Sequence, residues 1–80
     1  MKAKIIVMPK KSVLDPQGAT VKSALDHMHF NGIQSVRVGK FIEIEVADGA
    51  SREDARKQLD EACHRLLSNP VIEDYQLEIT

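Results

Sequence analysis

The feature that most constrains the fold is an alternating run from Val36 to Val46. Its even positions are apolar except for Lys40, and its odd positions end in two glutamates. A two-residue hairpin at Gly39-Lys40 would put apolar and charged side chains on one face, because strand side chains alternate with a period of two. We therefore predict one long strand that bends near Gly39, since glycine inside a strand often marks a bend.

Two helices are predicted, one on each side of this run. Each begins with a side chain that can accept hydrogen bonds from the free amides of the first turn, and proline suits the first helical position. The first helix ends at Asn31-Gly32, and the second stops where proline cannot continue it. Apolar residues recur at helical spacing in both, including Val21 and Met28 in the first. The predicted capping and stop residues are Asp15, Pro16, Ser51, Asn69 and Pro70.

Shorter strands are predicted at residues 4–8 and 71–79, because β-branched and aromatic residues are enriched there. The order strand, helix, long strand, helix, strand predicts an α+β fold. In it, two helices pack on one face of a mainly antiparallel sheet, ferredoxin-like in character. The chain has 80 residues, enough for one modest core, so residues 1–80 are expected to form a single domain.

The long strand is longer than its predicted neighbours. Roughly a dozen residues span about 40 Å, and the first strand can pair with only part of that length. The remainder would be an exposed edge, which proteins normally cover. We expect a second copy to cover it, giving a homodimer or homotetramer in which dimerisation extends the sheet.

Residues around the bend are the candidate interface. Lys40 falls on the apolar side of the strand, where an unpaired ammonium is costly to bury, so it should lie at the rim or contact another chain. Glu43 and Glu45 share the opposite face, which meets either solvent or basic groups of another surface. The candidate interface residues are Arg37, Gly39, Lys40, Phe41, Glu43 and Glu45.

The potential metal ligands are poorly spaced. His27 and His29 are two apart and point to different sides of a helix, and Cys63 and His64 are adjacent. Structural zinc sites normally show close ligand pairs such as C-x₂-C or H-x₃-H. We therefore predict no metal site.

No catalytic or cofactor-binding residue is predicted either. Cys63 falls in an apolar helix face, whereas a reactive thiolate needs an electropositive, partly exposed setting. The segment from Asp15 to Gly18 lacks the glycine spacing and lysine of a P-loop. A net charge of −1 and three aromatic residues that no basic run accompanies argue against binding to nucleic acid.

The N-terminal apolar run covers only Ile5 to Met8, too short for a signal peptide or a membrane span. The chain contains one cysteine and so cannot form an internal disulfide. These features predict a soluble cytoplasmic protein that does not bind a membrane.

Three segments, in this order, resemble the PurS family, the small subunit of phosphoribosylformylglycinamidine synthase. They are VLDPQG (13–18), VRVGKFIEIEV (36–46) and CHRLLSNPVIEDY (63–75). The resemblance implies a non-catalytic assembly subunit in purine biosynthesis. It would bridge a PurQ-like glutaminase and a PurL-like synthetase and support ammonia transfer between them. ATP and Mg²⁺ would belong to the large synthetase subunit.

A second hypothesis is an ACT-like regulatory module, which binds a small molecule between paired chains of similar architecture. Such modules usually place a glycine-containing loop between the first strand and the first helix. Here that connector, residues 10–14, contains no glycine. Binding of the two large subunits, as against binding of a free amino acid, separates the two hypotheses.

Overall fold

The computed structural model describes all 80 residues and shows the predicted α+β fold, with every expected element in the expected order. The elements are β1 (Lys2–Pro9), α1 (Pro16–His27), β2 (Lys40–Glu45), α2 (Arg52–Ala62), the π-helical turn η1 (Cys63–Leu67) and β3 (Glu73–Ile79).

β1 is the central strand of a three-stranded antiparallel sheet with the order β2-β1-β3. Ile5 lies opposite Ile42 of β2 and Leu77 of β3. Alternate residues of β1, namely Ala3, Ile5 and Val7, are fully buried because they face the helical layer. This face of the sheet carries the core.

α2 and η1 supply the other half of the core. Cys63 is fully buried and clusters with Ile5 and Val7, as its place in the apolar helix face predicts. Leu66 follows Cys63 at helical spacing, which predicts it on the same face, but it is 79% exposed. The π-helical turn adds a residue to the last turn and rotates Leu66 outward, while Leu67 still packs against the core.

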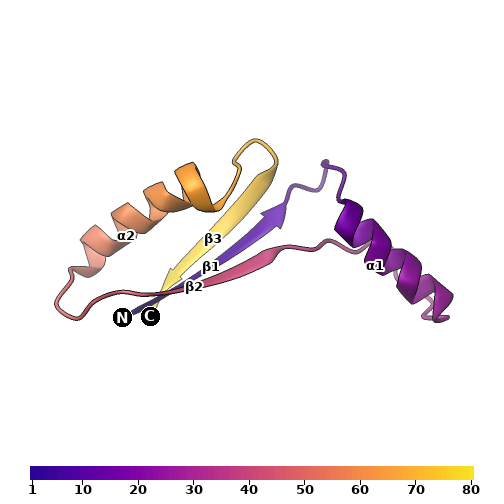
Figure 1. Cartoon of the computed structure of the whole chain (residues 1–80), viewed down its shortest axis with the longest axis horizontal. Helices are drawn as coiled ribbons and strands as arrows, with labels where there is room; N and C mark the ends of the chain where they lie inside the picture. Colours follow the sequence, from indigo (N-terminus) through magenta and orange to yellow (C-terminus); the bar gives the residue numbers. More distant parts are fainter.

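α1 stands away from the sheet (Figure 1). Within one chain only α2 and η1 pack on the sheet, and the molecule measures 51 × 24 × 15 Å. The apolar stripe of α1 is consequently uncovered, with Val21 41% and Met28 64% exposed. We call α1 together with residues 28–39 the arm.

The run from Val36 to Val46 is continuous and not a hairpin, but only Lys40–Glu45 pairs with the sheet. Val7 and Lys40 form the last pair of the ladder. The next hydrogen-bonded pair would join Pro9 to Val38, and proline has no N–H to donate. The predicted strand therefore leaves the sheet at Gly39 and continues as the unpaired return segment of the arm.

α1 ends earlier than predicted, at His27 rather than at Asn31-Gly32. His29 adopts the left-handed conformation (φ 64°), and the Phe30 amide donates to the Leu25 carbonyl at 3.1 Å. This is the geometry of a Schellman-type cap, with histidine in the place usually taken by glycine. Gly32 also has positive φ but lies in the turn that follows.

Candidate functional site

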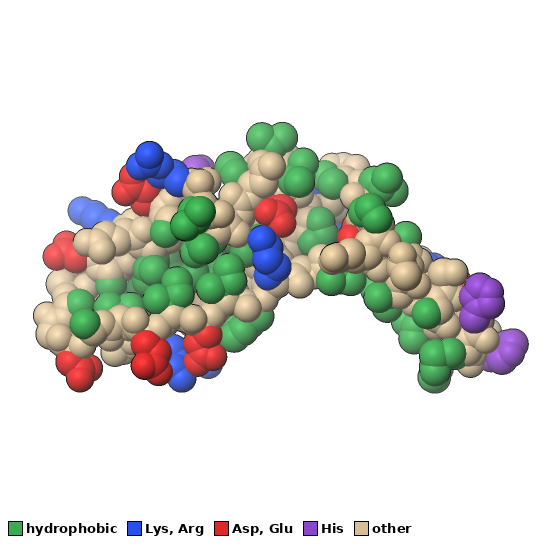
Figure 2. Space-filling model, in the orientation of Figure 1, with side chains coloured by type: hydrophobic (Ala, Val, Ile, Leu, Met, Phe, Trp, Pro, Cys, Tyr) green, Lys and Arg blue, Asp and Glu red, His purple; other side chains and the backbone are tan.

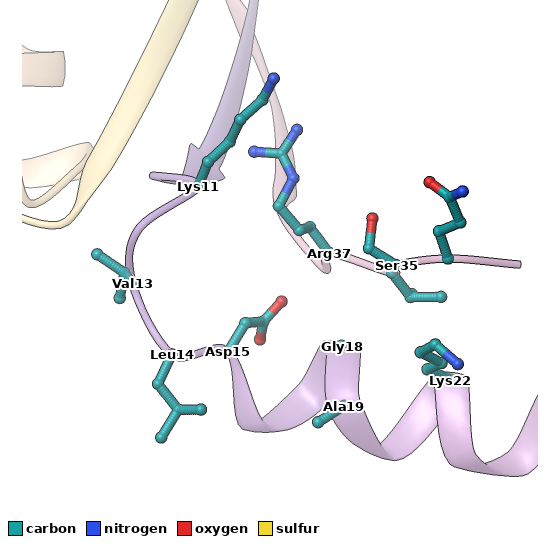
Figure 3. Close-up of a pocket in the computed structure, with 11 residues that line it drawn as sticks. Lys11, Val13, Leu14, Asp15, Gly18, Ala19, Lys22, Ser35 and Arg37 are labelled. Atoms are coloured by element: carbon teal, nitrogen blue, oxygen red, sulfur yellow. The ribbon is translucent and has the colours of Figure 1, made fainter.

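A hollow lies between the N-terminus of α1 and the return segment, where the arm meets the rest of the chain. Its volume is about 590 Å³ and it is open to solvent (Figure 3). Gly18 sits at its base, where an added Cβ would overlap the Val36 carbonyl oxygen. This close approach is why a residue without a side chain lies inside a helix at this point. The lining side chains include Lys11, Asp15, Lys22, Ser35 and Arg37.

Asp15 occupies the N-cap position of α1, but its side chain forms no capping hydrogen bond, contrary to the prediction. Instead the carboxylate Oδ2 accepts a hydrogen bond from the Val38 amide at 2.8 Å. This bond, with the nearby amides of Gly18 and Gln17, holds the pKa of Asp15 below its ordinary value. Asp15 thereby fixes the return segment against α1 and accepts the Val38 amide, which in a continued ladder would donate to the Pro9 carbonyl.

Most of the cationic side chains that line this hollow form a hydrogen bond or an ion pair within the chain. The Arg37 guanidinium donates through Nη1 to the Pro9 carbonyl at 3.0 Å, so it fastens the arm to the end of β1. Lys22 forms an ion pair with Asp26 at 3.0 Å along α1. Lys11 forms no ion pair and extends from the connector beside Arg37 (Figure 3). Within the chain, Arg37 acts as a link between the arm and the sheet.

Gly39, Lys40 and Phe41 lie where the arm meets the sheet. An added Cβ at Gly39 would overlap the Val7 carbonyl oxygen and the Met8 sulfur, so glycine lets the chain pass the end of β1. Lys40 is exposed at the rim, with Nζ 3.5 Å from the Leu67 carbonyl at the end of η1. Phe41 is 58% exposed on the sheet face opposite α2.

Glu43 and Glu45 project from the same open face of the sheet, and the two differ in their pairing. Glu43 Oε1 lies 2.7 Å from Lys2 Nζ on β1, and this hydrogen-bonded lysine lowers the pKa of Glu43. Glu45 is exposed and forms no ion pair. Glu45 is therefore the carboxylate that is more available for an ion pair with a partner surface.

The other predicted capping and stop residues lie at helix ends or in the turn that follows, and Ser51 and Asn69 form hydrogen bonds there. The Ser51 hydroxyl accepts a hydrogen bond from the Asp54 amide at 3.4 Å. Pro16 is the first residue of α1. Beyond η1, Asn69 Oδ1 accepts from the Val71 amide at 3.1 Å, so Asn69-Pro70 forms the turn into β3. These contacts are local and shape the connections.

One polar cluster was not anticipated from the sequence. The Tyr75 hydroxyl donates to Asp60 Oδ1 at 2.7 Å and lies 3.3 Å from His64 Nδ1. The bond to the Asp60 carboxylate raises the pKa of Tyr75 to about 12. Asp60 and Tyr75 are 15 residues apart on α2 and β3, so only the packing of these elements brings them together.

The remaining chemistry-bearing residues are dispersed. No group of three or more His, Cys, Asp or Glu side chains is arranged to hold a metal ion. His27 and His29 are exposed at the C-terminal end of α1, whereas Cys63 and His64 belong to η1, which follows α2, and Figure 1 shows α1 and α2 apart from each other. None of the helices is long and apolar enough to cross a membrane.

Comparison with known proteins gives consistent matches over nearly the whole chain. The family model described as PurS, phosphoribosylformylglycinamidine (FGAM) synthase, matches residues 2–80. The PurS subunit of Bacillus subtilis is 45% identical over 78 residues, covering 98% of this chain and 90% of that protein. The PurS subunit of Methanocaldococcus jannaschii is 38% identical over 78 residues, covering 98% and 93%.

Comparison with solved structures also gives matches to PurS proteins. A crystal structure of B. subtilis PurS has a TM-score of 0.84 at 45% identity, covering 96% of this chain and 94% of that one. A chain from the structure of PurLQS from Thermotoga maritima has a TM-score of 0.74 at 29% identity, covering 96% and 93%. These matches do not favour an ACT-like module. The chain therefore belongs to the PurS family of phosphoribosylformylglycinamidine synthase subunits.

Proposed function

We propose that this chain is the non-catalytic assembly subunit of phosphoribosylformylglycinamidine synthase in purine biosynthesis. It would bridge a glutaminase subunit and an ATP-dependent synthetase subunit and support ammonia transfer between them. The observation that carries the proposal is the match to PurS subunits along the whole chain, including one from a PurLQS structure. In this proposal residues 1–80 are one PurS-like domain, and ATP and Mg²⁺ act in the synthetase subunit.

The side chains support an assembly role. The one cysteine is buried, and desolvation raises the pKa of its thiol, which keeps it from serving as a thiolate nucleophile. Arg37 of the arm and Asp15 just before it are used in contacts that hold the arm in place. A free cysteine also fits the reducing cytoplasm, where we place the complex.

The arm supports self-association as part of this function. Its apolar stripe is exposed, and Ile42 and Ile44 on the helical face of β2 are only half-buried because α2 does not reach them. Apolar side chains gather in both places (Figure 2). We propose that the arm of one copy covers this part of another copy's sheet, which would give each sheet a second helix on the same face.

Reconstitution tests the bridging role. The synthetase and glutaminase subunits from the same source are mixed with and without this chain and separated by size-exclusion chromatography. We expect co-elution and glutamine-dependent synthesis only when the chain is present. The pure chain should hydrolyse neither glutamine nor ATP. Glutamine hydrolysis by the pure chain that disappears in Cys63→Ala would contradict the assembly role.

A further inference from the structure

The outer edge of β3 has no neighbour in the sheet. The Lys2 and Thr80 backbones exchange hydrogen bonds of 3.1 and 2.9 Å, which fixes the phase of the β1–β3 ladder. Because such pairs alternate in an antiparallel ladder, the N–H and C=O groups of Tyr75 and Leu77 point away from β1. They form a free edge that can accept another strand.

A contact at the end of this edge shows that it accepts donors. The Arg52 guanidinium of α2 donates through Nη2 to the Ile79 carbonyl at 2.6 Å. Ile79 has the same phase as Tyr75 and Leu77, so its carbonyl also points outward. A side chain therefore satisfies one group of the edge, and the groups of Tyr75 and Leu77 remain available.

A groove of about 470 Å³ runs beside this edge. Tyr75 and Leu77 form its β3 side, and Glu53, Arg56, Lys57 and Asp60 form its α2 side. The hydrogen bond from Tyr75 to Asp60 spans from one side of the groove to the other. Arg56, Lys57 and Glu53 form no ion pair, and the Asp60 carboxylate accepts from Tyr75, so the groove presents two available cations and one available carboxylate beside an apolar leucine.

We propose that this groove binds an extended segment of a partner protein, which adds as a strand beside β3. Its backbone would pair with Tyr75 and Leu77, and alternate side chains would fall into the groove. One such side chain is apolar and packs on Leu77. A neighbouring one is acidic and pairs with Arg56 or Lys57. The proposal rests on the proposed function, in that the partner is one of the two larger subunits.

A second copy of this chain is a poorer occupant. Pairing of β2 from one copy with β3 of another is a head-to-tail contact, which produces rings or open filaments. The arm and the β2 side of the sheet already offer a surface for a symmetric pair, which leaves the β3 groove free. The groove thus provides attachment without competing with self-association.

Amide exchange tests the site directly. The chain is placed in deuterated buffer alone and in complex with the synthetase or glutaminase subunit, then exchange is quenched and read at single residues. In one complex, the Tyr75 and Leu77 amides should exchange at least about tenfold more slowly than in the free chain. The double variant Arg56→Glu/Lys57→Glu should raise the Kd for that subunit about tenfold.

Arg65→Glu is the matched control, because Arg65 is exposed on the other flank of the α2–η1 helix and outside the groove. It should leave the Kd unchanged, and circular dichroism should show that all variants fold. A complex that forms without slowing the Tyr75 and Leu77 amides would overturn the groove proposal alone. Failure to bind either subunit would overturn the assembly role as well. Slowing that grows with the concentration of the chain alone would assign the groove to a second copy.

Discussion

Cys63 illustrates how single residues act in this protein. It is fully buried at the start of η1, where it packs against Ile5 and Val7 of the central strand. Desolvation is the main cause of the raised pKa of its thiol, and the nearby Asp60 carboxylate adds to it. Cys63 therefore has a structural role, as a packed core residue, and not a reactive one.

Cys63→Ala should lower the free energy of unfolding by about 1 kcal/mol, because the smaller side chain leaves a small cavity. Urea denaturation of both proteins measures the change. The native thiol should react with a thiol reagent only after denaturation. Rapid labelling of the folded protein would show that Cys63 is accessible.

Asp15 should make the arm sensitive to acid. Its pKa is lower in the folded chain than the ordinary value of 3.8, so its stabilising contribution is present above that value and is lost as the pH falls through the folded pKa. Asp15→Asn should remove this dependence below about pH 3.8 and weaken the Val38 contact at neutral pH. The Val38 amide chemical shift, followed during an acid titration, reports both effects. A wild-type titration identical to that of the variant would contradict this role.

At the scale of elements, two glycines decide how the arm leaves the body. Gly18 lets α1 approach the return segment, and Gly39 lets that segment pass the end of β1. Neither of these two glycines has a positive φ. Close approach, and not backbone conformation, therefore requires glycine at both positions.

Gly18→Ala should release the return segment from α1 while keeping the helix, because alanine favours helix formation but its Cβ would overlap the Val36 carbonyl. The Val38 amide should then lose its bond to Asp15 and exchange faster with solvent. Ser23→Ala, on an exposed face of the same helix, is the control and should change neither property. Unchanged exchange at Val38 in Gly18→Ala would mean that the hollow adjusts freely.

Gly39→Val should weaken the fold of the single chain as well as assembly, because its side chain would collide with the end of β1. We expect a loss of about 1–3 kcal/mol in the free energy of unfolding, measured by urea denaturation. Lys40→Ala is the control, since Lys40 is exposed and makes only one long contact. Equal stability of Gly39→Val and wild type would show that the strand shifts without cost.

At the scale of the whole molecule, the arm leaves the chain elongated and its apolar surface incomplete. A domain of this size buries a smaller share of its surface than a large domain does, and here a whole helix contributes little to the core. Self-association through the arm is the simplest way to cover it.

Val21→Asp and Met28→Asp should convert the oligomer to a monomer, because each places a charge on the exposed stripe of α1. Light scattering after size-exclusion chromatography measures the mass, expected to approach the 8.9 kDa of one chain. Ser23→Asp, on another face of the helix, should retain the wild-type mass. A wild-type protein that is itself monomeric at micromolar concentration would contradict self-association through the arm.

The order of elements and the core-facing side of β2 could be predicted from the sequence. Alternation in β2 and helical spacing in α2 depend on local periodicity, which one sequence shows directly. The choice of a continuous strand over a hairpin followed from the same periodicity. Of the candidate site, the sequence indicated the segment around Gly39 and the rim position of Lys40.

Tertiary structure alone decided where β2 leaves the sheet, because that depends on Pro9 lying opposite Val38. It also turned Asp15 from a helix cap into a link to Val38, rotated Leu66 outward through the π-helical turn and left α1 away from the sheet. The pairing of Tyr75 with Asp60 and the groove beside β3 arise in the same way. The Asp15–Val38 link, the Tyr75–Asp60 pair and the groove join residues distant in sequence, and local patterns carry no information about which distant residues will meet.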